Sequence, residues 1–211
     1  MNMPSQSAHP DYLARVQARL TALRQQLIAE IPPGIQELTW EVGSGHGHFL
    51  TRYAALNPGR FFIGIDLLGD RLRRASKKQL AAGVLNLRYI KAEALEFLEC
   101  LPVRVRISEV IVLFPDPWPK KRHFKHRLVQ PRFLDCLASR MVPGGRFYFR
   151  TDHEPYLEWT RDQLARHQSW SLISEPQWVH EETTVFQARA PSFRSLVAEL
   201  KTPMREGIPP D

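Results

Sequence analysis

Four acidic residues of this chain, each following a short apolar run, have the types and spacing that could bind a ligand. They are Glu41, Asp66, Glu93 and Asp116. If the apolar runs form parallel strands, the four carboxylates meet at the carboxyl edge of one sheet, where such folds bind their ligands. Carboxylates at this edge would accept hydrogen bonds from hydroxyl, amino or ammonium groups. We therefore expect one pocket with an acidic lining.

The stretch EVGSGHGHF, residues 41–49, is predicted to form a tight turn between a strand and a helix. Gly43 and Gly45 permit positive φ and a close approach of the backbone to a ligand. The spacing G-x-G-x-G differs from the G-x-G-x-x-G of dinucleotide-binding turns, and Glu41 would repel a diphosphate. An amino-acid ammonium group suits this turn better, which favours S-adenosylmethionine; a tight turn without a ligand is the alternative.

The next two acids each have a binding and a capping interpretation. Asp66 ends the second predicted strand, where a carboxylate can accept hydrogen bonds from both hydroxyls of a ribose or cap the following helix. Glu93 could accept a hydrogen bond from an adenine amino group, or lie in the first turn of a helix, where the helix dipole favours an acid. Three acids at three successive strand ends together predict a pocket for S-adenosylmethionine.

The fourth acid lies in the stretch FPDPWPKKRHFKHR, residues 114–127. Pro115 and Pro117 restrict the backbone on either side of Asp116, so its carboxylate is held on a stiff loop. A stiff loop favours a methyl transfer, because the rate depends on holding the reacting atoms near attack distance. The basic residues that follow indicate a polyanionic partner or a solvated charged loop; they include Lys120, Lys121, Arg122, Lys125 and Arg127.

Apolar runs and helical patterns alternate over most of the chain. Runs beginning at residues 38, 61, 86, 107 and 145 alternate with helical patterns over 46–56, 69–83, 93–100, 130–141 and 154–167. This alternation predicts an α/β fold with a Rossmann-like, doubly wound and mainly parallel sheet. Residues 170–179 and 193–200 are predicted to be two consecutive strands that form an antiparallel C-terminal edge.

The chain ends are predicted to differ from the central domain. Asp11 is predicted to cap a helix that packs on the core through apolar residues at helical spacing and stops at Pro32; these residues are Leu13, Val16, Leu20, Leu23 and Leu27. We expect an N-terminal tail and helix over 1–34, the main domain over 35–202, and a flexible tail over 203–211.

Composition limits the classes of partner. The 211 residues include 29 Lys and Arg against 22 Asp and Glu, a net charge of +7 that favours a polyanion such as nucleic acid. The two cysteines are too few for a disulfide framework, and the histidine spacing fits no standard metal site, so no metal is expected. Neither a secretory signal nor a run long enough to cross a bilayer occurs, which predicts a cytoplasmic protein without a membrane partner. Monomer and homodimer remain open.

Taken with EVGSGHG upstream and RTDHEPY downstream, the stretch FPDPWPKKRHFKHRLVQPRFL resembles the tRNA (guanine-N7)-methyltransferase family, from about Leu38 to Phe186. The resemblance implies a class I methyltransferase fold, S-adenosylmethionine as cofactor, and transfer of its methyl group to a guanine in the tRNA variable loop, position 46. It places Glu41, Asp66, Glu93 and Asp116 at cofactor-contacting positions, with Asp116 also the catalytic residue.

The same resemblance implies substrate contacts at Lys120, Asp152 and the segment from Thr184 to Gln187, and we expect the tRNA backbone to contact Lys121, Arg122, Lys125 and Arg127. Two departures from the family pattern stand out. Glu93 replaces the usual Asp, which lengthens the side chain and keeps the acceptor. The C-terminal motif reads TVFQ, so Gln187 stands where the family usually has Glu.

Two other functions fit parts of the pattern. The DPWP stretch also resembles the loop of methyltransferases that act on exocyclic amines, although Trp118 displaces the second proline of that motif. A basic RNA-binding module without catalytic activity would also explain the positive charge. Glycines and acids at four strand ends favour an enzyme over such a module.

Overall fold

The computed structural model describes residues 10–182, 190 and 192–201, so the predicted substrate-contacting residues Thr184 and Gln187 lie outside the described part of the chain. Helices and strands alternate as expected. In chain order they are α1 (Pro10–Glu30), β1 (Glu37–Val42), α2 (His48–Leu56), β2 (Phe62–Asp66), α3 (Gly69–Ala81), β3 (Leu87–Lys91), α4 (Ala94–Cys100), β4 (Arg106–Leu113), the 3-10 helix η1 (Lys121–His126), α5 (Pro131–Arg140), β5 (Met141–Thr151), α6 (Glu154–Arg166), β6 (Trp170–Leu172) and β7 (Arg194–Leu200).

The strands form one seven-stranded sheet in the order β3-β2-β1-β4-β5-β7-β6. The five strands from β3 to β5 run parallel, whereas β7 pairs antiparallel with β5 and with β6. The order in which successive strands are added to the sheet reverses between β1 and β4, which is the position where a doubly wound sheet opens a crevice for ligands. The expected α/β fold class, with its antiparallel C-terminal edge, is confirmed.

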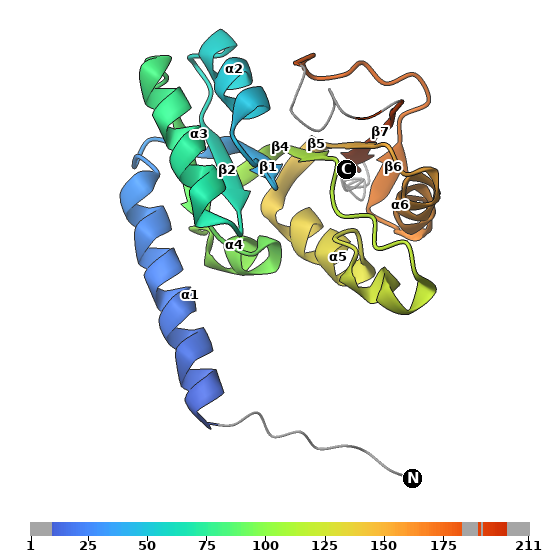
Figure 1. Ribbon diagram of the computed structural model, residues 1–211, viewed down its shortest axis with the longest axis horizontal. Helices are drawn as coiled ribbons and strands as arrows, with labels where there is room; N and C mark the ends of the chain where they lie inside the picture. The colour runs from blue at the N-terminus through green and yellow to red at the C-terminus, as the bar shows by residue number, and fades with distance from the viewer. Residues whose placement is uncertain (1–9, 183–189, 191, 202–211) are drawn as a thin grey trace, which may run out of the picture.

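Helices cover both faces of the sheet (Figure 1). On one face α1, α4, α5 and α6 enclose the larger apolar core, where the fully buried ring of Trp40 stacks on Phe97 with 4.7 Å between ring centroids. On the other face α2 packs Phe49 and Tyr53 against Phe62 in β2. Burial on both faces explains why the parallel strands read as apolar runs in the sequence.

The N-terminal helix packs on the core mainly through its second half, with Val16 partly buried against the core in its first half. Leu20, Leu23 and Leu27 are buried, whereas Leu13 is 55% exposed, because the first turns of α1 extend past the body of the domain (Figure 1). The helix begins at Pro10, so Asp11 lies inside the first turn, and the prediction that it caps the helix is wrong. Proline suits the first turn because its missing N–H would have no helical partner there.

The C-terminal edge differs from the expectation in the length of β6. The strand predicted over 170–179 spans only Trp170–Leu172. The last backbone hydrogen bond between this strand and β7 runs from the N–H of Ile173 to the carbonyl of Val197. Pro176 lacks an N–H and does not extend a ladder. The chain instead turns so that Trp178 packs edge-on against Tyr148, with 5.6 Å between ring centroids.

A close approach requires glycine at position 47. Gly47 has φ of 68° at the start of α2, and an added Cβ would lie 2.7 Å from the Cβ of Ala75 in α3. Real Cβ atoms need more room than this, and any L side chain at positive φ is strained in addition. The absence of a side chain therefore sets how closely α2 and α3 pack beside the glycine turn.

We predict that Gly47→Ala lowers the free energy of unfolding by about 2–4 kcal/mol, because a steric clash adds to the backbone strain. Gly83→Ala is the matched control, since Gly83 has φ of 64° but open space around its Cα. Urea unfolding of both variants separates the two effects. Equal losses in the two variants would show that the contact with Ala75 contributes nothing.

Candidate active site

A cavity of about 520 Å³ opens at the carboxyl edge of the sheet, where β1, β2, β3 and β4 end. Three of the four predicted acids line it: Asp66, Glu93 and Asp116. Gly43, with φ of 78°, forms part of the wall after β1. The volume lies within the range of small-molecule sites. The structure thus brings together three residues that span about fifty positions in sequence.

Asp66 ties two segments of the cavity wall together. Its Oδ2 accepts a hydrogen bond from the N–H of Gly45 at 3.0 Å, and its Oδ1 accepts one from the N–H of Leu68 at 2.8 Å. The guanidinium of Arg71 lies 3.8 Å from Oδ2. A carboxylate oxygen has two lone pairs, so each oxygen retains one for a ligand. The capping and ligand-binding interpretations of Asp66 are therefore compatible.

Glu41 lies one residue before the cavity wall and is 3% exposed. Its Oε2 and the hydroxyl of Ser44 are buried without a hydrogen-bond partner among the described residues. Burial, together with the nearby Asp66, raises the pKa of the Glu41 carboxyl to about 8. Buried polar atoms without partners are rare in folded proteins. Glu41 and Ser44 directly precede and follow the wall residues Val42 and Gly43, so these two atoms are candidates for contact with a ligand in the cavity.

Glu93 is the N-cap of α4. Its Oε2 accepts hydrogen bonds from the N–H groups of Leu95 and Glu96 at 2.8 and 3.1 Å. The side chain is exposed at the cavity, and Oε1 accepts no hydrogen bond from the described residues. Glu93 therefore fulfils the helix-capping role that the sequence left open, and it retains one oxygen for a ligand.

The loop after β4 carries Asp116 between two residues with unusual backbone geometry. Phe114 and Trp118 have φ of 49° and 47°, and they are the only non-glycine residues with positive φ in the described ranges. Bulky side chains rarely adopt this conformation, which costs about 1–3 kcal/mol per residue. Such strain persists only where the surrounding structure imposes it, and it is found most often at functional sites.

Arg127 imposes part of this geometry. Its Nε donates a 2.9 Å hydrogen bond to the carbonyl of Pro117, next to Trp118. The guanidinium lies over the rings of Phe124, Tyr156 and Trp159, at 3.7, 4.8 and 5.4 Å from their centroids. Arg127 is 2% exposed. The prediction that it contacts the tRNA backbone is therefore wrong: aromatic rings enclose its charge, and it anchors the loop.

The other predicted cationic residues of this segment do lie at the surface. Lys120, Lys121, Arg122 and Lys125 are exposed in and just before η1. Asp152 is exposed one residue after β5, the strand that pairs with β4, but it does not line the cavity. The structure therefore places the basic run beside the cavity and leaves Asp152 outside its wall.

Some residues of the site had no assigned role in the sequence. Trp118 and His126 line the cavity, with 5.0 Å between their ring centroids. Arg150, buried at the end of β5, forms two hydrogen bonds with the carboxylate of Glu181 and stacks 3.9 Å from the centroid of Trp178. For Trp118 the flanking prolines were a signal in the sequence that the residue could belong to the site. No sequence pattern indicates that Arg150 and Glu181 are partners.

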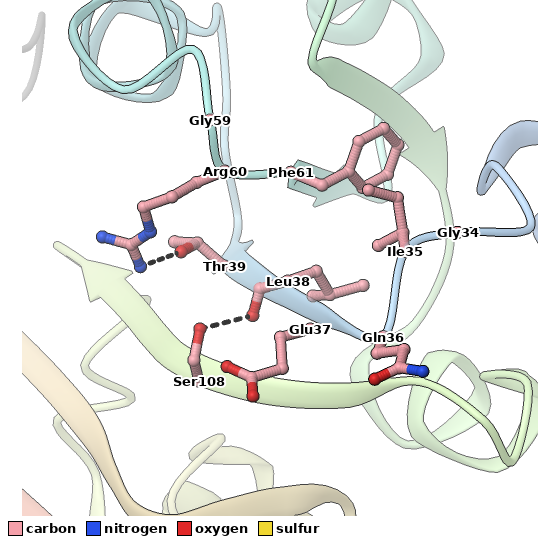
Figure 2. A pocket seen from close by; sticks show the side chains of 10 residues that line it. All are labelled: Gly34, Ile35, Gln36, Glu37, Leu38, Thr39, Gly59, Arg60, Phe61 and Ser108. Atoms are coloured by element: carbon pink, nitrogen blue, oxygen red, sulfur yellow. Dashed lines mark hydrogen bonds between the residues drawn. The ribbon is translucent and has the colours of Figure 1, made fainter.

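A second cavity of about 320 Å³ lies at the opposite, amino edge of the sheet (Figure 2). Three of the polar side chains drawn there already have partners. Arg60 donates to the hydroxyl of Thr39, and the hydroxyl of Ser108 donates to the carbonyl of Leu38. This cavity contains none of the predicted site residues. The carboxyl-edge cavity, which brings Asp66, Glu93 and Asp116 together, is the candidate active site.

Two further features bear on the expected partners. No helix in the described part of the chain has the length and apolar character needed to span a bilayer. Across the same residues, His, Cys, Asp and Glu side chains do not gather in groups of three that could hold a metal ion. Neither feature changes the assignment of the site.

Known proteins resemble this chain over most of its length. Residues 36–203 match a family described as "Putative methyltransferase". A tRNA (guanine-N(7)-)-methyltransferase of Nitrosococcus oceani is 37% identical over 150 residues, which cover 71% of this chain and 64% of the relative. A protein of the same name from Magnetococcus marinus is 35% identical over 181 residues, covering 78% of this chain and 69% of the relative. The chain thus spans under two thirds of the Nitrosococcus protein.

Solved structures agree on the fold. The 16S rRNA methyltransferase KamB superposes with a TM-score of 0.58 at 21% identity, covering 88% of this chain and 94% of that one. A likeness at this identity establishes the class I methyltransferase fold. The sequence relatives establish more, because their identity exceeds 30% over most of this chain. The chain belongs to the tRNA (guanine-N7)-methyltransferase family.

Proposed function

We propose that this protein transfers a methyl group from S-adenosylmethionine to N7 of a guanine in the tRNA variable loop. The observation that carries the proposal is the position of Asp116, which lies on a strained loop at a cavity also lined by Asp66 and Glu93. The relatives are named for this reaction. An exposed basic run next to the cavity suits a polyanionic substrate.

The acidic groups of the site fit S-adenosylmethionine. Glu41 offers a buried oxygen without a partner for the ammonium group of the methionine part. Asp66 offers lone pairs for the ribose hydroxyls, and Oε1 of Glu93 for the adenine amino group. When bound, S-adenosylmethionine supplies a methyl group activated by its sulfonium charge.

Asp116 does not need to act as a base in this reaction. Guanine N7 has a free lone pair and loses no proton when it is alkylated, so the demand on the protein is electrostatic. Positive charge moves onto the purine, and a fixed carboxylate stabilises it. Asp116 would also accept hydrogen bonds from the N1–H and amino groups of guanine, which excludes adenine. Asp152, exposed beyond the cavity wall, would join it where the base extends past that wall, while Lys120 would orient the ribose or phosphate.

The direct test is to incubate the protein with methyl-labelled S-adenosylmethionine and unmodified tRNA, and then to identify the methylated nucleoside by mass spectrometry. N7-methylguanosine in the variable loop is the expected product. N6-methyladenosine would support an exocyclic amine methyltransferase instead. Absence of methylation combined with tRNA binding would support a binding module.

We predict that Asp116→Asn lowers kcat by about 100-fold or more, since it removes the charge that stabilises the developing cation. Affinity for tRNA, measured by filter binding, should stay within about twofold, because phosphate contacts supply most of it. The exposed Asp162→Asn in α6 is a charge-matched control that should retain the wild-type rate. Normal turnover by Asp116→Asn would contradict the assigned role.

The raised pKa of Glu41 gives a prediction about pH. The folded protein holds this proton up to about pH 8, whereas the ordinary pKa of the group is 4.5. Between these values the unfolded chain loses the proton and the folded chain keeps it, so the free energy of unfolding falls as pH rises. Glu41→Gln removes this effect. Urea unfolding should show the variant gaining roughly 2–5 kcal/mol over wild type between pH 4.5 and pH 8.5.

The same variant should bind S-adenosylmethionine at least about tenfold more weakly, since an amide does not pair with an ammonium group as a carboxylate does. Isothermal calorimetry provides this measurement. Higher stability with weaker binding would identify Glu41 as a ligand-binding group. An unchanged dissociation constant would exclude it from the site, whatever the stability of the variant.

The basic run gives a prediction about salt. Replacing Lys121, Arg122 and Lys125 by alanine should weaken tRNA binding and lower the slope of log K against log salt by about 2–3, roughly one for each phosphate that is no longer neutralised. Arg127→Met is the matched comparison from the same run. Its buried charge should leave the slope unchanged while loosening the loop and lowering kcat. An unchanged slope in the triple variant would assign the run to solvent.

A further inference from the structure

Trp118 has a strained backbone conformation, yet its indole contributes little to the packing of the fold. Its φ of 47° is unfavourable for an aromatic residue, and the side chain remains 37% exposed. Its ring contacts are with His123 and His126 at 5.9 and 5.0 Å, and both of these residues belong to η1 at the surface. Trp118 belongs to neither apolar core. Core packing therefore does not explain the strained conformation.

The position of the ring is fixed from both sides of the loop. On one side the N–H of Phe114 donates to the carbonyl of Arg150 at 2.8 Å, which continues the β4–β5 ladder. On the other side Arg127 holds the carbonyl of Pro117 at 2.9 Å. A loop fixed in this way presents the indole without an ordering cost when a ligand binds.

The ring also lies where the reaction would take place. Trp118 and His126 line the same cavity as Asp116, which is two residues away along the loop. The exposed lysines and arginine at 120–122 follow directly, so a nucleic-acid strand held by them would pass over the indole. An aromatic ring beside a basic groove is the usual arrangement for holding an unstacked base.

We propose that Trp118, packed against His126, is the surface on which the target guanine stacks, and that its π face stabilises the positive charge the base acquires on methylation. This inference rests on the proposed function. A nucleotide that leaves its stack to enter an active site loses stacking energy, which an aromatic side chain restores. The indole face also attracts cations, so it favours the methylated, cationic purine over the neutral one.

In the transfer step the N7 lone pair forms the new N–C bond while the bond from carbon to sulfur breaks and its electron pair stays on sulfur. No proton is released, and the products are the neutral thioether S-adenosylhomocysteine and an N7-methylguanine that carries one positive charge. The indole of Trp118 then stacks on the face of the cationic purine, while the carboxylate of Asp116 lies at the edge of the purine. The two groups would stabilise the same charge from different directions.

The test compares Trp118→Leu with Trp118→Phe, because leucine keeps apolar bulk without a π face and phenylalanine keeps a weaker one. We expect kcat/KM for tRNA to fall roughly 10- to 100-fold in the leucine variant and by less in the phenylalanine variant. The dissociation constant of S-adenosylmethionine should stay within about twofold of wild type. Tyr12→Leu, an exposed aromatic on α1 that lies outside the cavity, is the matched control.

A second readout does not depend on turnover. With S-adenosylhomocysteine present, tRNA should quench the tryptophan fluorescence of wild type more than that of Trp118→Phe. A binding measurement adds to this: the ratio of the dissociation constants of Trp118→Leu and wild type should be larger for tRNA that already carries N7-methylguanine than for unmodified tRNA. Equal quenching, equal kcat/KM, or a loss that appears only in S-adenosylmethionine affinity would overturn the proposal. Wild type without tRNA methylation would instead overturn the proposed function itself.

Discussion

Two carboxylates buried beside each other, Glu41 and Asp66, are the constraint on which the rest of the site depends. Burial in a low-dielectric interior disfavours the charged form of Glu41, and the neighbouring carboxylate of Asp66 adds to this effect. Asp66 is stabilised by the N–H groups of Gly45 and Leu68, whereas Glu41 keeps its proton up to about pH 8. Because Asp66 connects the glycine turn to the residue before α3, the same interaction also fixes the shape of the cavity wall. The proposed binding site and a local loss of stability thus arise from the same pair of carboxyl groups.

In the loop after β4, the contacts of Arg127 offset the cost of strained backbone conformations. Phe114 and Trp118 hold unfavourable backbone conformations, and Arg127 holds the segment in place from within a cage of three aromatic rings. The positive charges of this stretch therefore divide into two groups. One buried guanidinium positions the loop, while the exposed lysines and Arg122 are free to meet a polyanion.

Much of the fold could be predicted from the sequence because its signals are local. Apolar runs of strand length alternate with helical patterns, and in a parallel sheet their order along the chain places every strand end at one edge. That reasoning located Asp66, Glu93 and Asp116, which all line one cavity. It failed for the length of β6, where Pro176 and the packing of Trp178 draw the chain away from the sheet. It also failed for Asp11, which was expected to cap α1 but lies inside the helix, because α1 begins at Pro10.

The sequence by itself determined the order of the elements, the acids at the strand ends and the family, since each follows from residue types at fixed spacing. Only the tertiary structure decided which charges are exposed. Arg127 reads as one cation among several, and its burial depends on Tyr156 and Trp159, some thirty residues further along the chain. Trp118 likewise reads as part of a motif, and its place at the cavity depends on how Arg127 and Arg150 hold the loop. Contacts between distant segments leave no periodic signal, so no local pattern could have predicted them.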